Sequence, residues 1–413
     1  MDLIIGAGIS GLSYASYTKN DYIIVEAASE PGGYCRTIKR NGFVWDYSGH
    51  FFHFQHPEIR DYVCENIPQD HLVEVEKHTQ IYYKGSYIDF PFQKNIYQLP
   101  KEEFIDALID VYLAEKDHKE SLSFKEMVYN NLGKAIAEKF LIPYNEKLYA
   151  CDLNTLDKEA MGRFFPKTTF EEILLNSKQN NNLSYNSTFT YPVGGAEEYV
   201  QAVLSKTDSS KLFLNERILR IDAENKIAYT DKREIKYDNL ISTLPFPLLL
   251  DMVGSKYKKT DFSCNKVLVL NLGFDKDSTD KTNSWVYFPD KDIVFYRLGY
   301  YNNIISNNRM SLYIEIGLKE DDELKDFSYY LDKTLADLKK IGIVTDHQLV
   351  DYEAILMNPA YVHITQQSEK IVSQLKDDLK KQNIYSIGRY GSWTYCSIED
   401  NILEAKALSD TLL

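Results

Sequence analysis

The N-terminus holds the feature that most restricts how this chain can fold. A short apolar run leads into G-A-G-I-S-G at 6–11, and a helix-compatible stretch and a second apolar run, 22–25, follow. This order is typical of the strand, turn, helix and strand of dinucleotide-binding folds. Gly6 allows the tight turn, Gly8 lets the backbone approach a pyrophosphate, and Gly11 lets the helix pack closely on the strand. We therefore expect an α/β fold with a nucleotide site at the N-terminus.

Composition and charge exclude several classes of protein. The 413 residues are 44% hydrophobic and 26% charged, which is typical of a packed globular protein. Lys and Arg number 47 and Asp and Glu number 61, a net charge of 47 − 61 = −14, and no basic cluster stands out. Nucleic acid is therefore not an expected partner.

The sequence also indicates the cellular compartment of the protein. The most apolar long stretch, 240–253, is too short for a membrane span and contains two prolines. No secretory signal is visible, so we expect a cytoplasmic protein. The five cysteines are scattered and form no C-x-x-C pair, so reduced thiols are expected and no metal site.

A second group of residues indicates which nucleotide is bound. Glu26 ends the second apolar run, where a carboxylate would accept hydrogen bonds from ribose hydroxyls. With Gly32, Gly33 and Arg36 it resembles the pattern of flavoproteins built like amine oxidases and protoporphyrinogen oxidase. The segment 237–245 resembles the one by which that superfamily re-enters its FAD domain. The resemblance implies FAD rather than NAD.

We expect three parts in the fold: a Rossmann-like FAD-binding domain, a helical insertion and a second mixed, mostly antiparallel sheet domain. Their ranges are 1–95, 190–255 and 380–413 for the discontinuous FAD-binding domain, 96–185 for the helical substrate-binding insertion, and 256–379 for the β-sheet substrate domain. Helical periodicity appears over 102–113 and 123–140, where Ser123 and Glu126 match a capping box. Short β-type runs over 212–243 predict a small sheet appended to the nucleotide fold.

Four further segments resemble UDP-galactopyranose mutases. The run DYSGHFFHF at 46–54 resembles their glycine-histidine loop, and PYNEKLY at 143–149 resembles their P-Y-N-x-K-x-W segment. Residues 285–297 are similar to the segment that supplies a diphosphate-binding tyrosine and arginine in the eukaryotic-type mutases. GRYGSWTY at 388–395 nearly matches their C-terminal G-R-F-G-S-W-x-Y run. The chain thus resembles the members of this family, which are isomerases (intramolecular transferases).

The resemblance implies a set of site residues. Those expected at the cofactor are Gly6, Gly8, Gly11, Glu26, Gly33, Arg36, Gly49, His50, Gly388, Arg389 and Glu399. Those expected at the substrate are Asn145, Tyr149, Arg163, Trp285, Tyr287, Arg297, Tyr361 and Tyr395, with Lys167 as an alternative to Arg163. An arginine guanidinium can donate two parallel hydrogen bonds to the oxygens of a diphosphate, and tyrosine hydroxyls add uncharged donors. His50, Arg297 and Arg389 are the expected catalytic residues.

The implied reaction uses FAD in its reduced form. N5 of the flavin would attack the anomeric carbon, the nucleoside diphosphate would leave, and ring opening and closure would interconvert pyranose and furanose without net redox change. The implied partners are a nucleotide-diphosphate sugar and an external reductant such as NAD(P)H. A role in galactofuranose supply for cell-surface polysaccharide follows from the same resemblance. Oligomeric state stays open, with a homo-oligomer among the alternatives.

Three departures leave the sugar open. Ser48 replaces the family's first loop glycine, Tyr149 replaces a tryptophan, and the G-G-T-G turn reads G-G-A-E at 194–197. UDP-galactopyranose is the first choice, with an N-acetylated hexosamine or a dTDP-6-deoxyhexose as alternatives. A net-redox flavoenzyme of the amine oxidase or desaturase type and a flavin-binding regulatory protein are the rival functions. The Asn-rich stretch 302–308 is either a substrate lid or an ordinary surface loop.

Overall fold

The cofactor part is organised around a parallel sheet assembled from three distant segments. The structure, a computed structural model, describes residues 1–117, 119–178, 187–305 and 307–412. The five strands run in the order β19-β13-β1-β2-β9. Their bounds are β1 Asp2–Ile5, β2 Tyr22–Val25, β9 Leu212–Phe213, β13 Asn239–Ser242 and β19 Ile384–Ser386. All neighbours pair in parallel, and the apolar runs without alternation suit a sheet covered on both faces.

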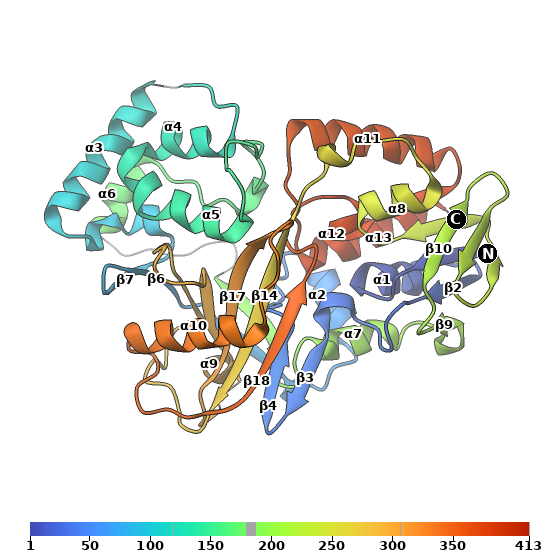
Figure 1. The fold of residues 1–413 in the computed structure, drawn as a ribbon, viewed down its shortest axis with the longest axis horizontal. Helices are drawn as coiled ribbons and strands as arrows, with labels where there is room; N and C mark the ends of the chain where they lie inside the picture. The colour runs from blue at the N-terminus through green and yellow to red at the C-terminus, as the bar shows by residue number, and fades with distance from the viewer. Residues whose placement is uncertain (118, 179–186, 306, 413) are drawn as a thin grey trace.

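Helices and small sheets surround this sheet. Helix α1 packs against α13 and α7, and α11 packs against β19. The helices are α1 Ile9–Tyr17, α2 Pro57–Cys64, α7 Glu197–Leu204, α8 Phe246–Val253, α11 Gln366–Lys380, α12 Gly388–Gly391 and α13 Ile398–Thr411. The small sheets are β3 Thr37–Arg40 with β4 Phe43–Asp46, β5 Leu72–Glu76 with β8 Thr188–Pro192, and β10 Ile218–Asp222 with β11 Ile227–Thr230 and β12 Glu234–Lys236. Both chain ends lie beside this part (Figure 1).

The helical insertion forms a separate lobe at upper left in Figure 1. Its helices are α3 Lys101–Asp117, α4 Phe124–Ile136, a π-helical turn Ala137–Leu141, α5 Ile142–Tyr149 and α6 Phe170–Lys178. Half of the expected capping box is present. The Ser123 hydroxyl accepts the Glu126 backbone N–H at 3.2 Å, but the Glu126 carboxylate accepts from the N–H of Leu122 instead of Ser123. The insertion is thus closely where its periodicity predicts it.

The second sheet has seven strands in the order β18-β14-β17-β16-β15-β6-β7. Their bounds are β6 Thr79–Tyr83, β7 Ser86–Asp89, β14 Asn265–Phe274, β15 Trp285–Tyr287, β16 Arg297–Tyr300, β17 Ser311–Lys319 and β18 Leu349–Met357, with α9 Tyr301–Ile304 and α10 Phe327–Lys340 beside them. β15 pairs with β6 in parallel and the other neighbours are antiparallel, so the predicted mixed sheet is confirmed. Leu268 and Leu270 pack with Leu338 of α10 on one face, while Val267 and Val269 face the main core.

Two segments lie outside the parts expected for them, and a third lies in a different sheet of its expected part. β6 and β7, within 1–95, complete the second sheet because β6 finds its partner in β15. β13, expected in the small appended sheet, is a central strand of the parallel sheet. α11, within 256–379, packs on β19 of the cofactor part. The placement of β6 and β13 arises from strand pairing between distant segments, which local patterns do not encode, whereas α11 packs on the strand that follows it in the sequence.

A buried carboxylate joins the two parts at the end of β4. Asp46 is fully buried, and its side chain accepts hydrogen bonds from the Thr37 hydroxyl at 2.6 Å, the Tyr191 hydroxyl at 2.8 Å and the Ala196 N–H at 3.0 Å. Its backbone carbonyl accepts from the Asn271 amide of β14. Burial raises the pKa of Asp46 to about 6, although the hydrogen bonds oppose the rise. The charged form is therefore disfavoured in the folded protein.

Replacement of Asp46 by Asn should flatten the pH dependence of stability. A carboxyl whose folded pKa is raised contributes stability that is complete below its ordinary value near 3.8 and lost as pH rises through 6. The free energy of unfolding of the wild type should fall relative to Asp46→Asn by on the order of 1–3 kcal/mol between pH 4 and 7. Urea unfolding measures this difference, with exposed Asp70→Asn as the control. Parallel pH profiles for wild type and Asp46→Asn would contradict it.

Candidate active site

A cavity of about 660 Å³ lies where the three parts of the chain meet. Its wall includes the N-terminal glycine turn, the loop 48–53, helix α5, strands β15 and β16, and the start of α13. The size suits a bound cofactor or drug-sized ligand, which typically occupies 300–1,000 Å³. Most of the predicted site residues are therefore brought to one place.

The glycine turn leaves space for an anion. A Cβ on Gly6, whose φ is +98°, would lie 2.2 Å from the Thr243 hydroxyl, and a Cβ on Gly11 would lie 2.0 Å from the Gly6 carbonyl oxygen. At Gly8 a Cβ would meet no described atom within 4 Å. The first turn of α1 has no side-chain cap and no acidic residue, so its N–H groups face the cavity wall uncompensated.

Glu26 and Arg36 line the cavity beside this turn. The Glu26 carboxylate accepts the N–H of Ala7 on one oxygen and that of Ala28 on the other, both at 2.8 Å. Each oxygen keeps a second lone pair for a ribose hydroxyl. Arg36 donates to the Gly33 carbonyl and lies 4.7 Å from the centre of the Tyr47 ring. Its geometry fixes the second glycine turn, in which Gly33 has φ +57°.

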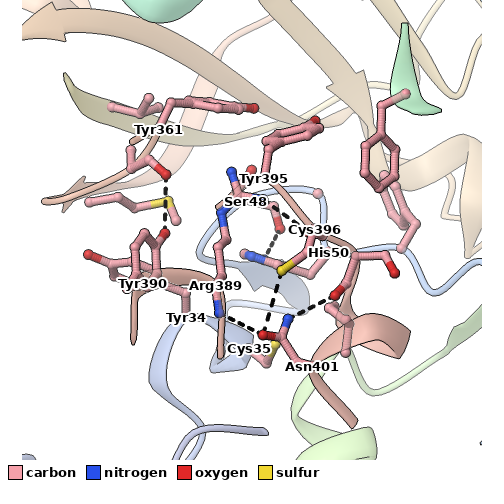
Figure 2. Close-up of a pocket in the computed structure, with 18 of the residues that line it drawn as sticks. Tyr34, Cys35, Ser48, His50, Tyr361, Arg389, Tyr390, Tyr395, Cys396 and Asn401 are labelled. Carbon is pink, nitrogen blue, oxygen red and sulfur yellow. Dashed lines mark hydrogen bonds between the residues drawn. The ribbon is translucent and has the colours of Figure 1, made fainter. Parts of the chain in front are cut away.

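The C-terminal turn places Arg389 at the centre of the cavity wall (Figure 2). Gly388 has φ +85°, and a Cβ there would lie 2.5 Å from the Ser10 hydroxyl of α1. The Arg389 N–H donates to Asn401 at 2.7 Å, and Asn401 also accepts from Ser10. The start of α12 is therefore fastened to both α13 and the glycine turn.

The Arg389 guanidinium is surrounded by aromatic rings instead of acids. Its centre lies 4.7 Å from the Tyr395 ring, 5.3 Å from Tyr361 and 6.0 Å from Tyr390. It donates to the Cys396 carbonyl at 3.2 Å, and within the described residues no carboxylate lies within ion-pair distance. Tyr361 and Tyr395 stack on each other at 5.9 Å, and no hydrogen bond among the described residues engages either hydroxyl. The cluster offers one cation and two hydroxyl donors to a ligand.

The loop 48–53 presents a neutral histidine to the cavity. His50 Nδ1 lies 3.0 Å from the Ser48 carbonyl, which can only accept, so Nδ1 carries the proton. Burial lowers the pKa of His50 to about 4. At neutral pH its Nε2 is therefore a hydrogen-bond acceptor. Gly49 is required beside it, since a Cβ there would lie 2.7 Å from the Tyr313 hydroxyl.

Arg297 is already paired with a carboxylate that was not predicted. It lies directly opposite Glu315 in the β16–β17 ladder, and Nε and Nη2 donate to the two Glu315 oxygens at 2.8 and 2.6 Å. Ser48 donates to the same carboxylate. Burial raises the pKa of Glu315, but the Arg297 charge and these hydrogen bonds outweigh it and hold the pKa below its ordinary value. Arg297 reaches the cavity as part of a neutral pair.

Aromatic residues form the opposite wall. Trp285 Nε1 donates to the Tyr287 hydroxyl at 2.8 Å, which leaves the O–H of Tyr287 to donate elsewhere. Asn145 of α5 lines the cavity, donates to the Leu141 carbonyl, and has a buried carbonyl oxygen without a described partner. Tyr149 is not brought to the wall, because its ring lies behind Tyr361 at 5.7 Å.

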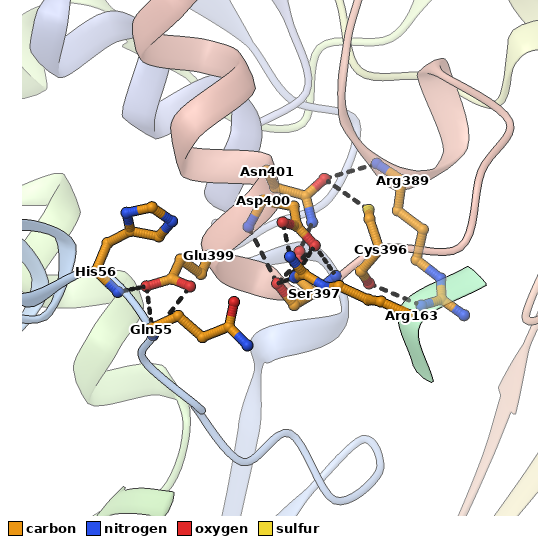
Figure 3. Close-up of polar contacts among 9 residues, drawn as sticks. All are labelled: Gln55, His56, Arg163, Arg389, Cys396, Ser397, Glu399, Asp400 and Asn401. Atoms are coloured by element: carbon orange, nitrogen blue, oxygen red, sulfur yellow. Dashed lines mark hydrogen bonds and ion pairs between the residues drawn. The ribbon is translucent and has the colours of Figure 1, made fainter. Parts of the chain in front are cut away.

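Two further predicted residues make structural contacts near the start of α13, Glu399 from within the helix and Arg163 from the turn Gly162–Phe164 (Figure 3). Glu399 lines the cavity, but its carboxylate accepts the backbone N–H groups of Gln55 and His56 at 2.9–3.1 Å. Arg163 is not at the cavity wall. It forms an ion pair with Asp400 at 2.8 Å, and its side chain is 45% exposed. Its alternative, Lys167, is likewise not part of the lining.

Comparisons with known proteins identify the family. Residues 9–412 match the family described as flavin containing amine oxidoreductase. The chain belongs to that family. Coproporphyrinogen III oxidase of Staphylococcus aureus (strain NCTC 8325 / PS 47) is 22% identical over 69% of this chain and 70% of that protein. Chloroplastic protoporphyrinogen oxidase of Nicotiana tabacum is 25% identical over 38% of this chain and 30% of its own length.

Comparison of folds gives a neighbour of a different kind. A crystal structure of reduced UDP-galactopyranose mutase matches 100% of this chain and 93% of that chain with a TM-score of 0.92 at 24% identity. At that identity the likeness establishes the fold alone. The predicted α/β fold with its Rossmann-like cofactor part is confirmed, and the chain is a flavoprotein enzyme.

The residues present fit the flavin-containing amine oxidoreductase family's cofactor. The open backbone at Gly8, the uncapped start of α1 and the free lone pairs of Glu26 together suit a pyrophosphate and a ribose. FAD is thus supported by both family and site. Among the described residues, no group of three His, Cys, Asp or Glu side chains could hold a metal ion. No described helix has the length and apolar character needed to cross a membrane.

Several functional residues escaped the sequence patterns. Glu315 and Asn401 bind predicted residues, and Lys77 lines the cavity with a pKa that burial lowers to about 8. A signal for Glu315 existed, since it is a lone acid in the apolar run of β17. Asn401 and Lys77 lie in mixed segments that give no such signal.

The structure also shows the surroundings of two unusual sequence features, the altered glycine turn and the Asn-rich stretch. Glu197, the acid of the altered glycine turn, pairs with Lys39 at 2.6 Å and does not line the cavity. In 302–308, the side-chain oxygen Oδ1 of Asn302 accepts the Ser311 N–H, and the Asn303 side chain donates to two backbone carbonyls, which anchors this end of the stretch. Residue 306 lies outside the described residues, so the lid prediction is not addressed there.

Substitution of the turn glycines should separate stability from cofactor binding. Gly8→Ala adds a methyl group to open space at the cavity wall, so the apoprotein should unfold within about 0.5 kcal/mol of wild type but retain little flavin. Gly11→Ala forces a Cβ against the Gly6 carbonyl and should cost about 2 kcal/mol or more. Thermal unfolding of the apoprotein and visible absorbance of the purified protein measure both effects. A fully flavin-loaded Gly8→Ala protein would contradict the pyrophosphate assignment.

Proposed function

We propose that this protein interconverts the pyranose and furanose forms of a nucleotide-diphosphate sugar, with UDP-galactopyranose and UDP-galactofuranose as the first choice. The observation that carries the proposal is the Arg389 cluster. An arginine without a carboxylate partner among the described residues, and the hydroxyls of Tyr361 and Tyr395, face one cavity with the flavin turn. This set suits a dianionic diphosphate.

Binding of the diphosphate falls to residues of several segments. Arg389 supplies the charge, and the hydroxyls of Tyr361, Tyr395 and Tyr287 supply neutral donors. Burial strengthens such interactions because little water competes for them. Asn145 adds an acceptor for a hydroxyl or N–H of the ligand. Lys77, on the same wall, adds a second cation whose charge is partly lost above pH 8.

Arg297 has a positioning role in this proposal. Its guanidinium is neutralised by Glu315, so it cannot offer a full positive charge to the diphosphate. The pair instead holds Ser48, and through it the loop that carries His50. Arg163 and Tyr149, expected at the substrate, have no direct part because neither lines the cavity.

The chemistry itself belongs to the cofactor. When bound and reduced, FAD supplies a nucleophilic nitrogen to the sugar, and a reductant such as NAD(P)H is needed to reach that form. The chain contributes orientation and a dry environment. His50 stays neutral at pH 7 and offers Nε2 as an acceptor beside the reacting groups, without adding a positive charge.

A net-redox oxidase is the second candidate. It is favoured by the two sequence relatives, both named as porphyrinogen oxidases. A porphyrinogen is a large macrocycle that must give up electrons to an acceptor, whereas a sugar isomerisation needs none. The two reactions therefore differ in their requirement for oxygen and for reduced flavin.

One assay separates the candidates. Dithionite-reduced and oxidised protein are each incubated with UDP-galactofuranose, an N-acetylhexosamine analogue or a porphyrinogen, and products are followed by HPLC. We expect UDP-galactopyranose to form with the reduced protein alone. Porphyrinogen oxidation by the oxidised protein under oxygen, with no sugar nucleotide converted, would refute the mutase proposal in favour of the oxidase.

Arg389→Met should weaken nucleotide binding and spare the flavin. Loss of a buried charge-assisted contact costs about 1.5–3 kcal/mol, which corresponds to a roughly 10- to 100-fold higher dissociation constant for UDP. The backbone contacts of the turn do not depend on this side chain. Isothermal titration with UDP and the visible flavin spectrum test both points, with exposed Arg220→Met as the control. Unchanged UDP affinity, or loss of the flavin, would show that Arg389 does not bind the diphosphate.

A further inference from the structure

Lys147 makes an unusual set of contacts beside the candidate active site. It lies on α5, two residues after Asn145. Its ammonium donates to four backbone carbonyls of the connection between β15 and β16. These are Phe288 at 2.8 Å, Asp290 at 2.9 Å, Ile293 at 2.8 Å and Phe295 at 2.5 Å. An ammonium has three N–H groups, so four carbonyls at this distance hold it by charge and dipole as well as by hydrogen bonds.

The two elements that Lys147 joins carry adjoining walls of the cavity. α5 supplies Tyr144 and Asn145, while the β15–β16 hairpin supplies Tyr287 and Arg297. The rings of Tyr144 and Tyr287 are 5.0 Å apart and meet edge to face. The relative position of α5 and the hairpin thus sets how the lining side chains of the two elements are placed toward one another.

The surroundings leave little room for another arrangement. A Cβ on Gly317 of β17 would lie 2.0 Å from the Lys147 carbonyl oxygen, so helix and sheet are in close backbone contact. The connection itself is held on its far side, where Asp337 of α10 accepts the Val294 N–H at 2.8 Å. Lys147 is thus a buried link from the insertion into this loop, beside the surface ion pair between Glu146 of α5 and Lys291 of the loop.

We propose that Lys147 is a positioning residue whose ammonium fastens the helical insertion to the β15–β16 connection and so holds the two substrate-facing walls in register. Its effect on ligand binding rests on the proposed function, whereas the fastening itself does not. Lys147 does not reach the cavity lining. Substrate affinity is thereby linked to a contact outside the substrate site.

The link should respond to pH. Burial lowers the pKa of Lys147 to about 7, against the opposing influence of Asp290 and Asp337. The other charged groups close by, Glu146 and Lys291, pair with each other at 2.8 Å at the surface. The ammonium is complete below pH 7 and is lost as pH rises through it, so the contact should be firm at pH 6 and weak at pH 8.5.

Hydrogen–deuterium exchange of the flavin-loaded protein tests the fastening. Exchange of peptides covering 288–297 and 142–149, corrected for intrinsic chemical rates, should be about tenfold faster at pH 8.5 than at pH 6 in the wild type. Lys147→Met should exchange fast at both pH values. Lys291→Met removes only the exposed ion pair between the same two elements, so it should lose little protection and keep the pH dependence of the wild type. Wild-type protection in Lys147→Met, or a wild type without pH dependence, would overturn the proposal.

UDP titration tests the consequence for the ligand. At pH 6 the dissociation constant of Lys147→Met should be about tenfold higher than that of wild type, and the two should converge at pH 8.5. Equal affinities at pH 6 would refute the positioning role. If Lys147→Met fails to fold, Lys147→Gln, which keeps two donors without the charge, replaces it. Failure of the wild type to bind UDP would count against the proposed function, while the exchange profile would still decide whether Lys147 fastens the two walls.

Discussion

The buried ion pair between Arg297 and Glu315 is the constraint on which the rest of the site depends. Either group alone would be a buried uncompensated charge, at a cost of about 3–5 kcal/mol. Because the two residues are directly opposite in the β16–β17 ladder, the strand register itself brings them together. Glu315 of the pair also accepts a hydrogen bond from the Ser48 hydroxyl. A loop of the cofactor part is therefore held by the ion pair of the second sheet. The orientation of His50, two residues further, follows from that contact.

The Arg297–Glu315 ion pair also decides which arginine of the cavity is available to a ligand. Arg297 is compensated internally, whereas Arg389 has aromatic rings and a backbone carbonyl as neighbours. An anionic ligand can therefore complete the charge of Arg389 without breaking an existing pair. When no ligand is bound, the surrounding aromatic rings stabilise the Arg389 guanidinium by about 0.5–2 kcal/mol for each close contact. The cavity is thus prepared for a single strongly anionic group next to the flavin turn, with tyrosine hydroxyls around it.

Local patterns predicted what depends on local physics. The glycine turn and the helices α3 and α4 of the insertion follow from conformational freedom, capping and periodicity, and they were found where expected. Arg163 was misjudged because its partner, Asp400, lies 237 residues further along the chain. Glu315 was missed for a similar reason, since its meaning appears only once β16 and β17 pair. β6 and β7 likewise belong to the second sheet because β6 pairs in parallel with the distant strand β15. The roles of the residues that do line the cavity remain proposals.

The way the cavity is assembled accounts for two kinds of relative. The cofactor wall comes from the parallel sheet and its turns, and these carry the backbone geometry that a flavin requires. The substrate wall comes from the insertion and the second sheet, which meet the cofactor part through separate contacts such as Asp46 and the Ser48–Glu315 bond. Substitutions on the substrate wall can change the reaction while the flavin site stays intact. Sequence similarity to oxidases and fold similarity to a mutase are therefore compatible, because one frame can hold the flavin while a few residues of the substrate wall differ.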